Sequence, residues 1–76
     1  MKVKAYILIN LISTNLAESM KRIRSIKGVA FADAVTGPYD AIAQISASDM
    51  DDLGRMVTSK IMKVKGVAKT LTCVAV

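Results

Sequence analysis

Residues 23–30, IRSIKGVA, recur as residues 61–68, IMKVKGVA, when the chain is set against itself with a shift of half its 76 residues. Both copies keep the first isoleucine, an aliphatic residue three positions later, and the run Lys-Gly-Val-Ala. With the same shift, Ala5 and Ile7 fall on Ala43 and Ile45. Self-similarity at a fixed spacing is the signature of a repeated structural unit. The sequence therefore predicts two copies of one unit.

The first unit reads as strand, helix, strand. Residues 3–11 alternate apolar with other residues at the period of a strand. Asn15, with Glu18 three positions later, predicts the start of a helix, and Gly28 predicts its end. A second strand is expected over residues 29–36. The predicted buried stripe of the helix is Leu16, Met20, Ile23 and Ile26.

The second unit follows a tight turn at residues 37–40, where Pro38 suits the first central turn position. We expect a strand over residues 40–47, a helix capped by Ser48 with Asp51, a helix end at Gly66, and a strand over residues 67–76. Gly54 weakens that helix by about 1 kcal/mol relative to alanine. The predicted buried stripe is Met50, Leu53, Val57 and Ile61.

The element order βαββαβ, with right-handed crossovers, predicts the α+β class and a ferredoxin-like arrangement. Four antiparallel strands would form one sheet with two helices on one face, in a single domain over residues 1–76. The other sheet face would be wet in a monomer, yet its expected residues are too apolar for water. We therefore expect a second copy of the chain to cover it. Those residues are Tyr6, Leu8, Ile42, Val74 and Val76.

Composition narrows the possible chemistry. The chain has one cysteine, Cys73, and no histidine, so an internal disulfide is excluded and neither a metal site nor a cofactor is expected. No nucleophile has an identifiable activating partner, which predicts that the protein is not an enzyme. The apolar run at residues 5–12 is far shorter than the ~20 residues of a membrane span. A free cysteine without a secretion signal predicts a cytoplasmic protein.

The net charge of +5 has two explanations. Cations near the ends of both predicted helices complement the negative end of the helix dipole, while acids open the second helix, as the dipole favours. The alternative is electrostatic contact with nucleic acid. An RNA-binding sheet of the RRM type is disfavoured, because the aromatic pattern of that fold is missing. The cations are Lys21, Arg22, Arg24, Lys27, Lys60, Lys63 and Lys65.

Two motifs remain: Thr-Gly-x-Tyr-Asp at residues 36–40 and Lys-Gly-Val-x-x-Thr-x-Thr at residues 65–72. Without further information the first is a hairpin turn, with Asp40 bonded to local backbone, and the second leads into a threonine-bearing edge strand. Their order and distance resemble the effector domain, or RAM domain, of the Lrp/AsnC family of transcription regulators. The resemblance covers essentially the whole chain.

The resemblance implies a dimer packed sheet to sheet, dimers assembled into a ring such as an octamer, and an amino-acid effector bound where dimers meet. The loop would hold the effector's amino and carboxylate groups, the last strand would offer hydroxyls, and the second helix would set selectivity. The implied ligand-binding residues are Thr36, Gly37, Tyr39, Asp40, Met56, Lys60, Thr70 and Thr72.

The helix-turn-helix domain of these regulators is not found in this sequence. The chain is thus expected to be a stand-alone sensing module without sequence-specific DNA binding of its own and without membrane attachment. Full-length family regulators are its expected partners. Two alternatives stay open: a small dimeric α+β-barrel enzyme of the monooxygenase type, and a basic nucleic-acid-binding domain.

Overall fold

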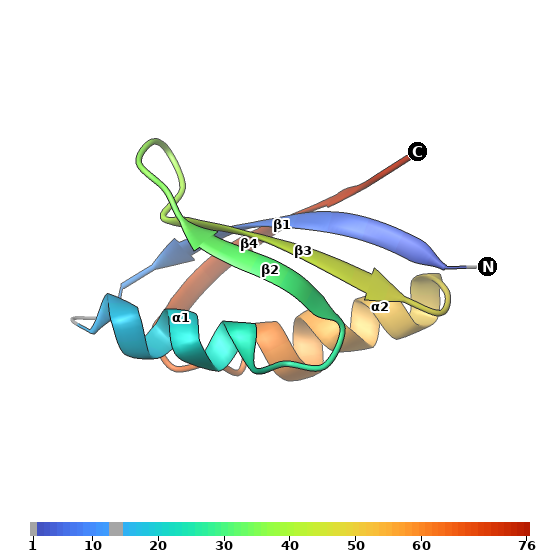
Figure 1. Ribbon diagram of the computed structural model, residues 1–76, viewed down its shortest axis with the longest axis horizontal. Helices are drawn as coiled ribbons and strands as arrows, with labels where there is room; N and C mark the ends of the chain where they lie inside the picture. Colours follow the sequence, from blue (N-terminus) through green and yellow to red (C-terminus); the bar gives the residue numbers. More distant parts are fainter. Residues whose placement is uncertain (1, 13–14) are drawn as a thin grey trace.

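A computed structural model describes residues 2–12 and 15–76, and it has the expected element order. The sheet order is β2-β3-β1-β4, with all neighbouring strands antiparallel. Both helices lie on one face of the sheet (Figure 1), which confirms the ferredoxin-like prediction. The elements are β1 (Val3–Leu11), α1 (Leu16–Arg24), β2 (Val29–Ala34), β3 (Ala41–Ala47), α2 (Met50–Met56), the π-helical turn η1 (Val57–Ile61) and β4 (Val67–Val74).

The core lies between the sheet and the helices. Alternate residues of β1 and β3 are fully or nearly fully buried there. β3 contributes mainly alanines, and these small side chains let the helices approach the sheet closely. Larger side chains from β1 and the helices fill the remaining space. The buried apolar residues are Ala5, Ile7, Ile9, Met20, Ile23, Ala32, Ala41, Ala43, Ile45, Ala47, Leu53, Val57 and Ile61.

Helix α1 begins as predicted, because Asn15 Oδ1 accepts a hydrogen bond of 3.1 Å from the Glu18 amide. Its buried face differs from the prediction, since Ile26 lies beyond the end of the helix and is only half-buried. Leu16 is 44% exposed, whereas Ser19 is buried. The Ser19 hydroxyl donates to the Lys65 carbonyl at 3.0 Å, and this bond offsets the cost of burying a polar atom.

Helix α2 begins one residue later than predicted. Asp49, not Ser48, is the capping residue, and its carboxylate accepts from the Asp52 amide at 2.8 Å. The Ser48 amide and hydroxyl both donate to Asp52 Oδ2, and these bonds lower the pKa of the Asp52 carboxyl. Met50 is 57% exposed and therefore does not belong to the buried stripe, because it lies at the first turn, beyond the edge of the core.

The duplication is visible in the joints between helix and strand. The Ile26 amide donates to Ile23 O and the Val29 amide to Ile26 O, and Val64 and Val67 repeat both bonds half a chain later. Gly28 and Gly66 each have φ of +99°, a conformation that glycine adopts cheaply. The prediction that these glycines end the helices directly is wrong. α1 and η1 stop earlier, and each glycine immediately precedes a strand.

Three strands are shorter than predicted. β2 stops at Ala34, β3 starts at Ala41, and β4 stops at Val74. The register also corrects the expected composition of the sheet face that carries no helix. Val74 pairs with the buried Ala5, and directly paired residues point to the same face, so Val74 lies on the helix side. Val76 lies beyond β4.

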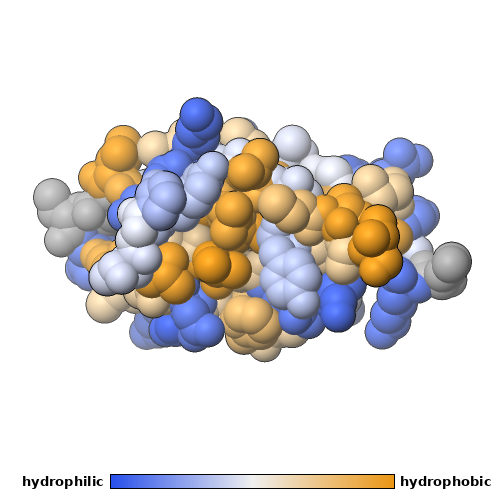
Figure 2. Space-filling model, turned by 90° about the horizontal axis from the view of Figure 1, so that it is seen from above, coloured by the Kyte–Doolittle hydropathy of each residue, from blue (hydrophilic) through white to orange (hydrophobic). Residues whose placement is uncertain are grey.

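The open face, meaning the sheet face without helices, is nevertheless apolar, as predicted. Figure 2 views this face and shows hydrophobic side chains running across it. Phe31 and Leu71 are 41% and 47% exposed. The apolar members, assigned by strand register, are Tyr6, Leu8, Phe31, Ile42, Leu71 and Cys73. Across the described ranges, no helix has the length and apolar character to span a bilayer.

Candidate functional site

The loop of residues 35–40 projects from the sheet at the end opposite the chain termini (Figure 1). The Val35 amide donates to the Asp40 carbonyl at 2.9 Å and closes the loop. The Asp40 amide then donates to the Ile9 carbonyl at 2.9 Å, and the Leu11 amide donates to Asp40 Oδ2 at 2.8 Å. Asp40 therefore fastens the loop to the end of β1.

A second tie involves a side chain that the sequence did not single out. Asn10 Nδ2 donates to the Pro38 carbonyl at 3.0 Å, so β1 holds the loop at its tip as well as at its base. Asn10 follows the alternation of β1 on the open face, where an isolated polar residue gives no signal of a contact 28 residues away. The predicted tight turn at residues 37–40 is instead a wider loop, closed by the local bond from the Val35 amide to the Asp40 carbonyl. The Asp40 carboxylate bonds to the distant backbone of Leu11 and not to local backbone.

The remaining loop residues are available to a ligand. Thr36 and Gly37 are exposed, and Tyr39 is half-buried. Gly37 has φ of +139°, and a Cβ at this position would meet no atom within 4 Å. The glycine is thus required by backbone conformation and not by crowding. The loop presents an open surface whose base is fixed.

The two threonines lie across β1 from the loop. Thr70 pairs with Ile9 and Thr72 with Ile7, and Ile9 is also the residue that accepts the Asp40 amide. The loop and Thr70 thus lie at the same end of β1, with β1 between them. By register, both threonines point to the helix side of the edge strand β4, where Thr70 is half-buried and Thr72 exposed.

Met56 and Lys60 are not brought to this place within one chain. They line an open groove of about 900 Å³ together with Lys2, Gly28 and Ser46. Ser46 lies near the far end of β3 from Ala41, where the loop joins that strand. At ~3.4 Å per residue of strand, these two groups of predicted residues occupy opposite ends of the sheet.

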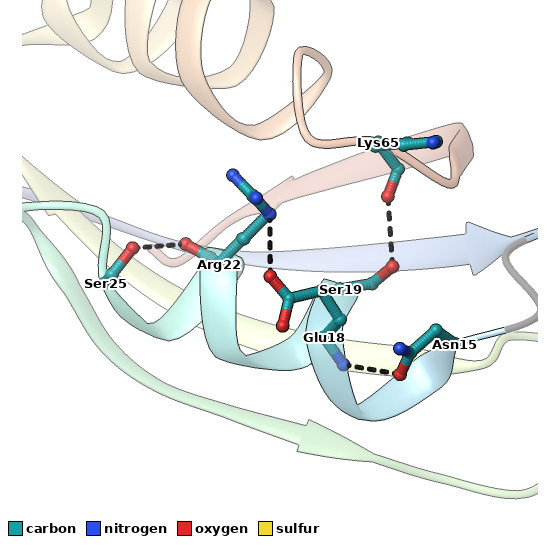
Figure 3. Close-up of polar contacts among 6 residues, drawn as sticks. All are labelled: Asn15, Glu18, Ser19, Arg22, Ser25 and Lys65. Atoms are coloured by element: carbon teal, nitrogen blue, oxygen red, sulfur yellow. Dashed lines mark hydrogen bonds and ion pairs between the residues drawn. The ribbon is translucent and has the colours of Figure 1, made fainter.

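One further contact supports the start of β4. Figure 3 shows the Ser19 hydroxyl of α1 reaching the Lys65 carbonyl, just before the Thr-x-Thr strand. The Ile12 amide also donates to the Gly66 carbonyl at 2.8 Å. The first turn of α1 and the end of β1 therefore position the segment that carries Thr70 and Thr72.

The described part of the chain has no side-chain arrangement typical of a metal site or of a polar internal cavity. Within residues 2–12 and 15–76, no three or more Cys, Asp or Glu side chains gather where they would hold a metal ion. In the same ranges, every buried side-chain nitrogen or oxygen has a hydrogen-bond partner. The space between sheet and helices is filled by the aliphatic core.

The chain is similar in sequence to known proteins. The model of the Lrp/AsnC ligand-binding domain matches residues 4–76. Uncharacterised HTH-type transcriptional regulators of Pyrococcus horikoshii and Pyrococcus furiosus are 33% and 31% identical over 58 residues, or 76% of this chain. The chain spans only 39% of the length of each regulator.

Solved structures show the same fold. The crystal structure of FFRP-DM1 has a TM-score of 0.90 and 30% identity, covering 97% of this chain and 99% of that one. The protein TTHA0845 of Thermus thermophilus has a TM-score of 0.90 and 31% identity, covering 97% and 92%. A regulator of Neisseria meningitidis, solved as a complex with L-Met, has a TM-score of 0.87 at 18% identity, covering 97% and 49%. The family match over residues 4–76, together with this fold, shows that the chain belongs to the Lrp/AsnC ligand-binding domain family.

Proposed function

We propose that this protein is a small-molecule sensor and assembly module of transcription regulation, and that its ligand is an amino acid held by the loop of residues 35–40. The observation that carries the proposal is the fastening of this loop to β1 by Asp40 and Asn10. A loop fixed before the ligand arrives loses less entropy on binding. The family match supports a ligand-binding role.

The groups around the loop suit an amino acid. Asp40 has one carboxylate oxygen engaged by the Leu11 amide, and its negative charge would attract a ligand's ammonium group. Loop amides and the Thr36 hydroxyl would hold the carboxylate. The Neisseria meningitidis protein of the same fold, solved with L-Met, makes amino acids the first class to test.

Assembly would complete the site. The loop and β4 leave one side of the site open, and Met56 and Lys60 lie at the other end of the sheet. A neighbouring subunit would have to bring its own residues to the loop. The apolar open face would form the first contact, by packing against the same face of a second copy, since burying apolar area drives association. The resulting dimers would then form the larger ring.

Thermal unfolding with each of the twenty amino acids tests the proposal, with light scattering in parallel. At least one amino acid should raise the midpoint, because a ligand that binds only the folded state stabilises it by mass action. The Asp40→Asn variant keeps an oxygen for the Leu11 amide but loses the charge. It should unfold at nearly the wild-type midpoint without ligand and lose most of the ligand-induced rise.

Asp51→Asn is the matched control, because it removes one exposed carboxylate in the first turn of α2, away from the loop. It should keep the ligand-induced rise. If no amino acid shifts the midpoint, the ligand class is wrong. If Asp51→Asn abolishes the rise as fully as Asp40→Asn does, net charge and not the loop accounts for the effect.

A further inference from the structure

The ends of the two helices meet on the face opposite the open face. A groove of about 430 Å³ lies between the end of α1 and the end of η1, and it is lined by Arg22, Ser25, Ser59, Lys60, Lys63 and Lys65. It adjoins the 900 Å³ groove, with which it shares Ser25, Ile26 and Lys60. We call the two grooves together the basic groove.

Among the residues that the structure describes, six cations line the basic groove: Lys2, Arg22, Lys27, Lys60, Lys63 and Lys65. All six residues are exposed. Two carboxylates offset them: Asp52 lines the groove, and Glu18 pairs with Arg22 at 3.1 Å. The two helix ends add about half a negative charge each. The cations therefore outnumber the negative charges of the two carboxylates and the two helix ends together, and the groove keeps a net positive charge.

The two copies of the repeat create this excess together. Lys27 and Lys65 occupy equivalent positions in the duplicated segment, and the fold sets the ends of both helices side by side, so that cations far apart in sequence line connected surfaces. Figure 3 shows Arg22 on α1 and Lys65 on the neighbouring segment before β4. The sequence alone showed two separate helix ends.

We propose that the basic groove is a binding surface for the phosphate backbone of double-stranded nucleic acid, without sequence preference. Exposed, flexible lysines contact phosphates as point charges, and phosphate contacts carry no sequence information. Binding follows from release of the counterions that surround the phosphates. This function does not depend on an amino-acid ligand.

Other polyanions fit the surface less well. Single strands are held largely by stacking on aromatic side chains, but Tyr6 and Phe31 lie on the opposite face by register, and Tyr39 lies in the loop at the end of the sheet. An acidic protein partner would need a desolvated apolar anchor site. The apolar groove residues Ile26, Met56 and Val64 are already packed against the core.

The part of the basic groove that lies between the ends of α1 and η1 stays accessible when two open faces pack together, because the helices cover the opposite face of the sheet (Figure 1). A dimer would present one groove on each outer side. The two surfaces could engage separate segments of one duplex, and such multivalency strengthens binding without any new contact.

Fluorescence anisotropy with a labelled duplex of arbitrary sequence, measured over a range of NaCl concentrations, tests this proposal. Each neutralised phosphate contributes about −0.9 to the slope of log K against log salt, so roughly four to five contacts should give a slope of about −4. The variant Lys60→Gln/Lys63→Gln should bind more weakly at low salt, with the slope shallower by about 2.

The matched control is Lys4→Gln/Lys69→Gln, which removes the same charge from the open face, where both lysines lie by register. It should keep the wild-type slope, and light scattering should show the same mass for both variants. Undetectable binding at low salt overturns the proposal, as does an equal loss in both variants. Tighter binding of polyglutamate than of the duplex would assign the surface to acidic proteins instead.

Discussion

Asp40 contributes to the fold before any ligand binds, because its carboxylate accepts the Leu11 amide and its own amide donates to Ile9. The sequence motif pointed to this residue as a ligand contact, and only the fold reveals its structural contribution. The same side chain can do both, since the Leu11 amide engages a single carboxylate oxygen. A variant that removes the acceptor separates the two effects.

Asp40→Ala should lower the free energy of unfolding by about 1–3 kcal/mol, because the Leu11 amide loses its acceptor at a half-buried position. Urea unfolding measures the change. Asp40→Asn should restore most of the loss, since its side-chain oxygen can accept the same bond. Equal stability of Asp40→Ala and wild type would show that water replaces the carboxylate at no cost.

Gly28 shows crowding that its motif position does not reveal. A Cβ here would come within 2.5 Å of Met56 Cε and 3.0 Å of the Ser46 carbonyl. Glycine is therefore needed here for two reasons: φ is positive, and β3 and α2 pack too closely to leave room for a Cβ. Gly37 has the positive φ without the crowding. Gly28 is therefore required by backbone conformation and by close packing, whereas Gly37 is required by backbone conformation alone.

At the scale of elements, α2 and η1 follow the dipole rule but contain two irregularities. Asp51 and Asp52 lie in the first turn of α2 and Lys60 in the last turn of η1, as the dipole favours. The helix nonetheless carries Gly54 in its interior and widens at η1, where the Met62 amide donates to Val57 O. The apolar face of these two elements packs against the sheet and keeps them in place; its buried residues are Leu53, Val57 and Ile61.

Gly54→Ala should stabilise the protein by about 1 kcal/mol, because Gly54 is exposed and an added Cβ would meet open space. For a domain of this size the midpoint of thermal unfolding should rise by about 4–8 °C. Calorimetry provides the measurement, and Gly28→Ala is the opposite control, expected to destabilise. A lower midpoint for Gly54→Ala would mean that α2 requires glycine for another reason.

At the scale of the whole molecule, the sheet separates two surfaces of different character. The open face is apolar, with Leu8 and Ile42 paired at its centre, while the helix side carries the basic groove. Small domains bury a limited fraction of their surface, and a second copy on the open face would supply the missing burial. The two proposed contacts thus use opposite faces.

Leu8→Lys should convert the proposed dimer to a monomer, because it places a charge at the centre of the apolar contact. Light scattering should then give the chain mass of 8.1 kDa, and circular dichroism should show unchanged secondary structure. Leu16→Lys alters an exposed leucine of α1 on the other side and should leave the mass of the wild type. If light scattering gives the mass of a single chain for the wild-type protein, the proposed dimer is wrong.

The sequence predicted the arrangement of elements well, because each signal was local. Alternation over residues 3–11 matches the full length of β1, Asn15 caps α1, and the repeat of Lys-Gly-Val-Ala recurs as matching joints. Where two neighbouring residues could each cap a helix, the local sequence did not predict which one does. Ser48 and Asp49 are both good caps, and the fold decided between them by bringing the Asp49 carboxylate to the Asp52 amide.

The sequence by itself determined the duplication, the strand and helix order and the apolar open face, because side-chain period and turn residues act over a few positions. Only the tertiary structure decided that Asn10 and Asp40 fasten the loop to β1, that Val74 turns to the helix side, and that two helix ends form one basic groove. Each of these depends on strand register or on contacts between segments far apart in the chain. A local pattern of residues carries no information about strand register or about contacts between distant segments.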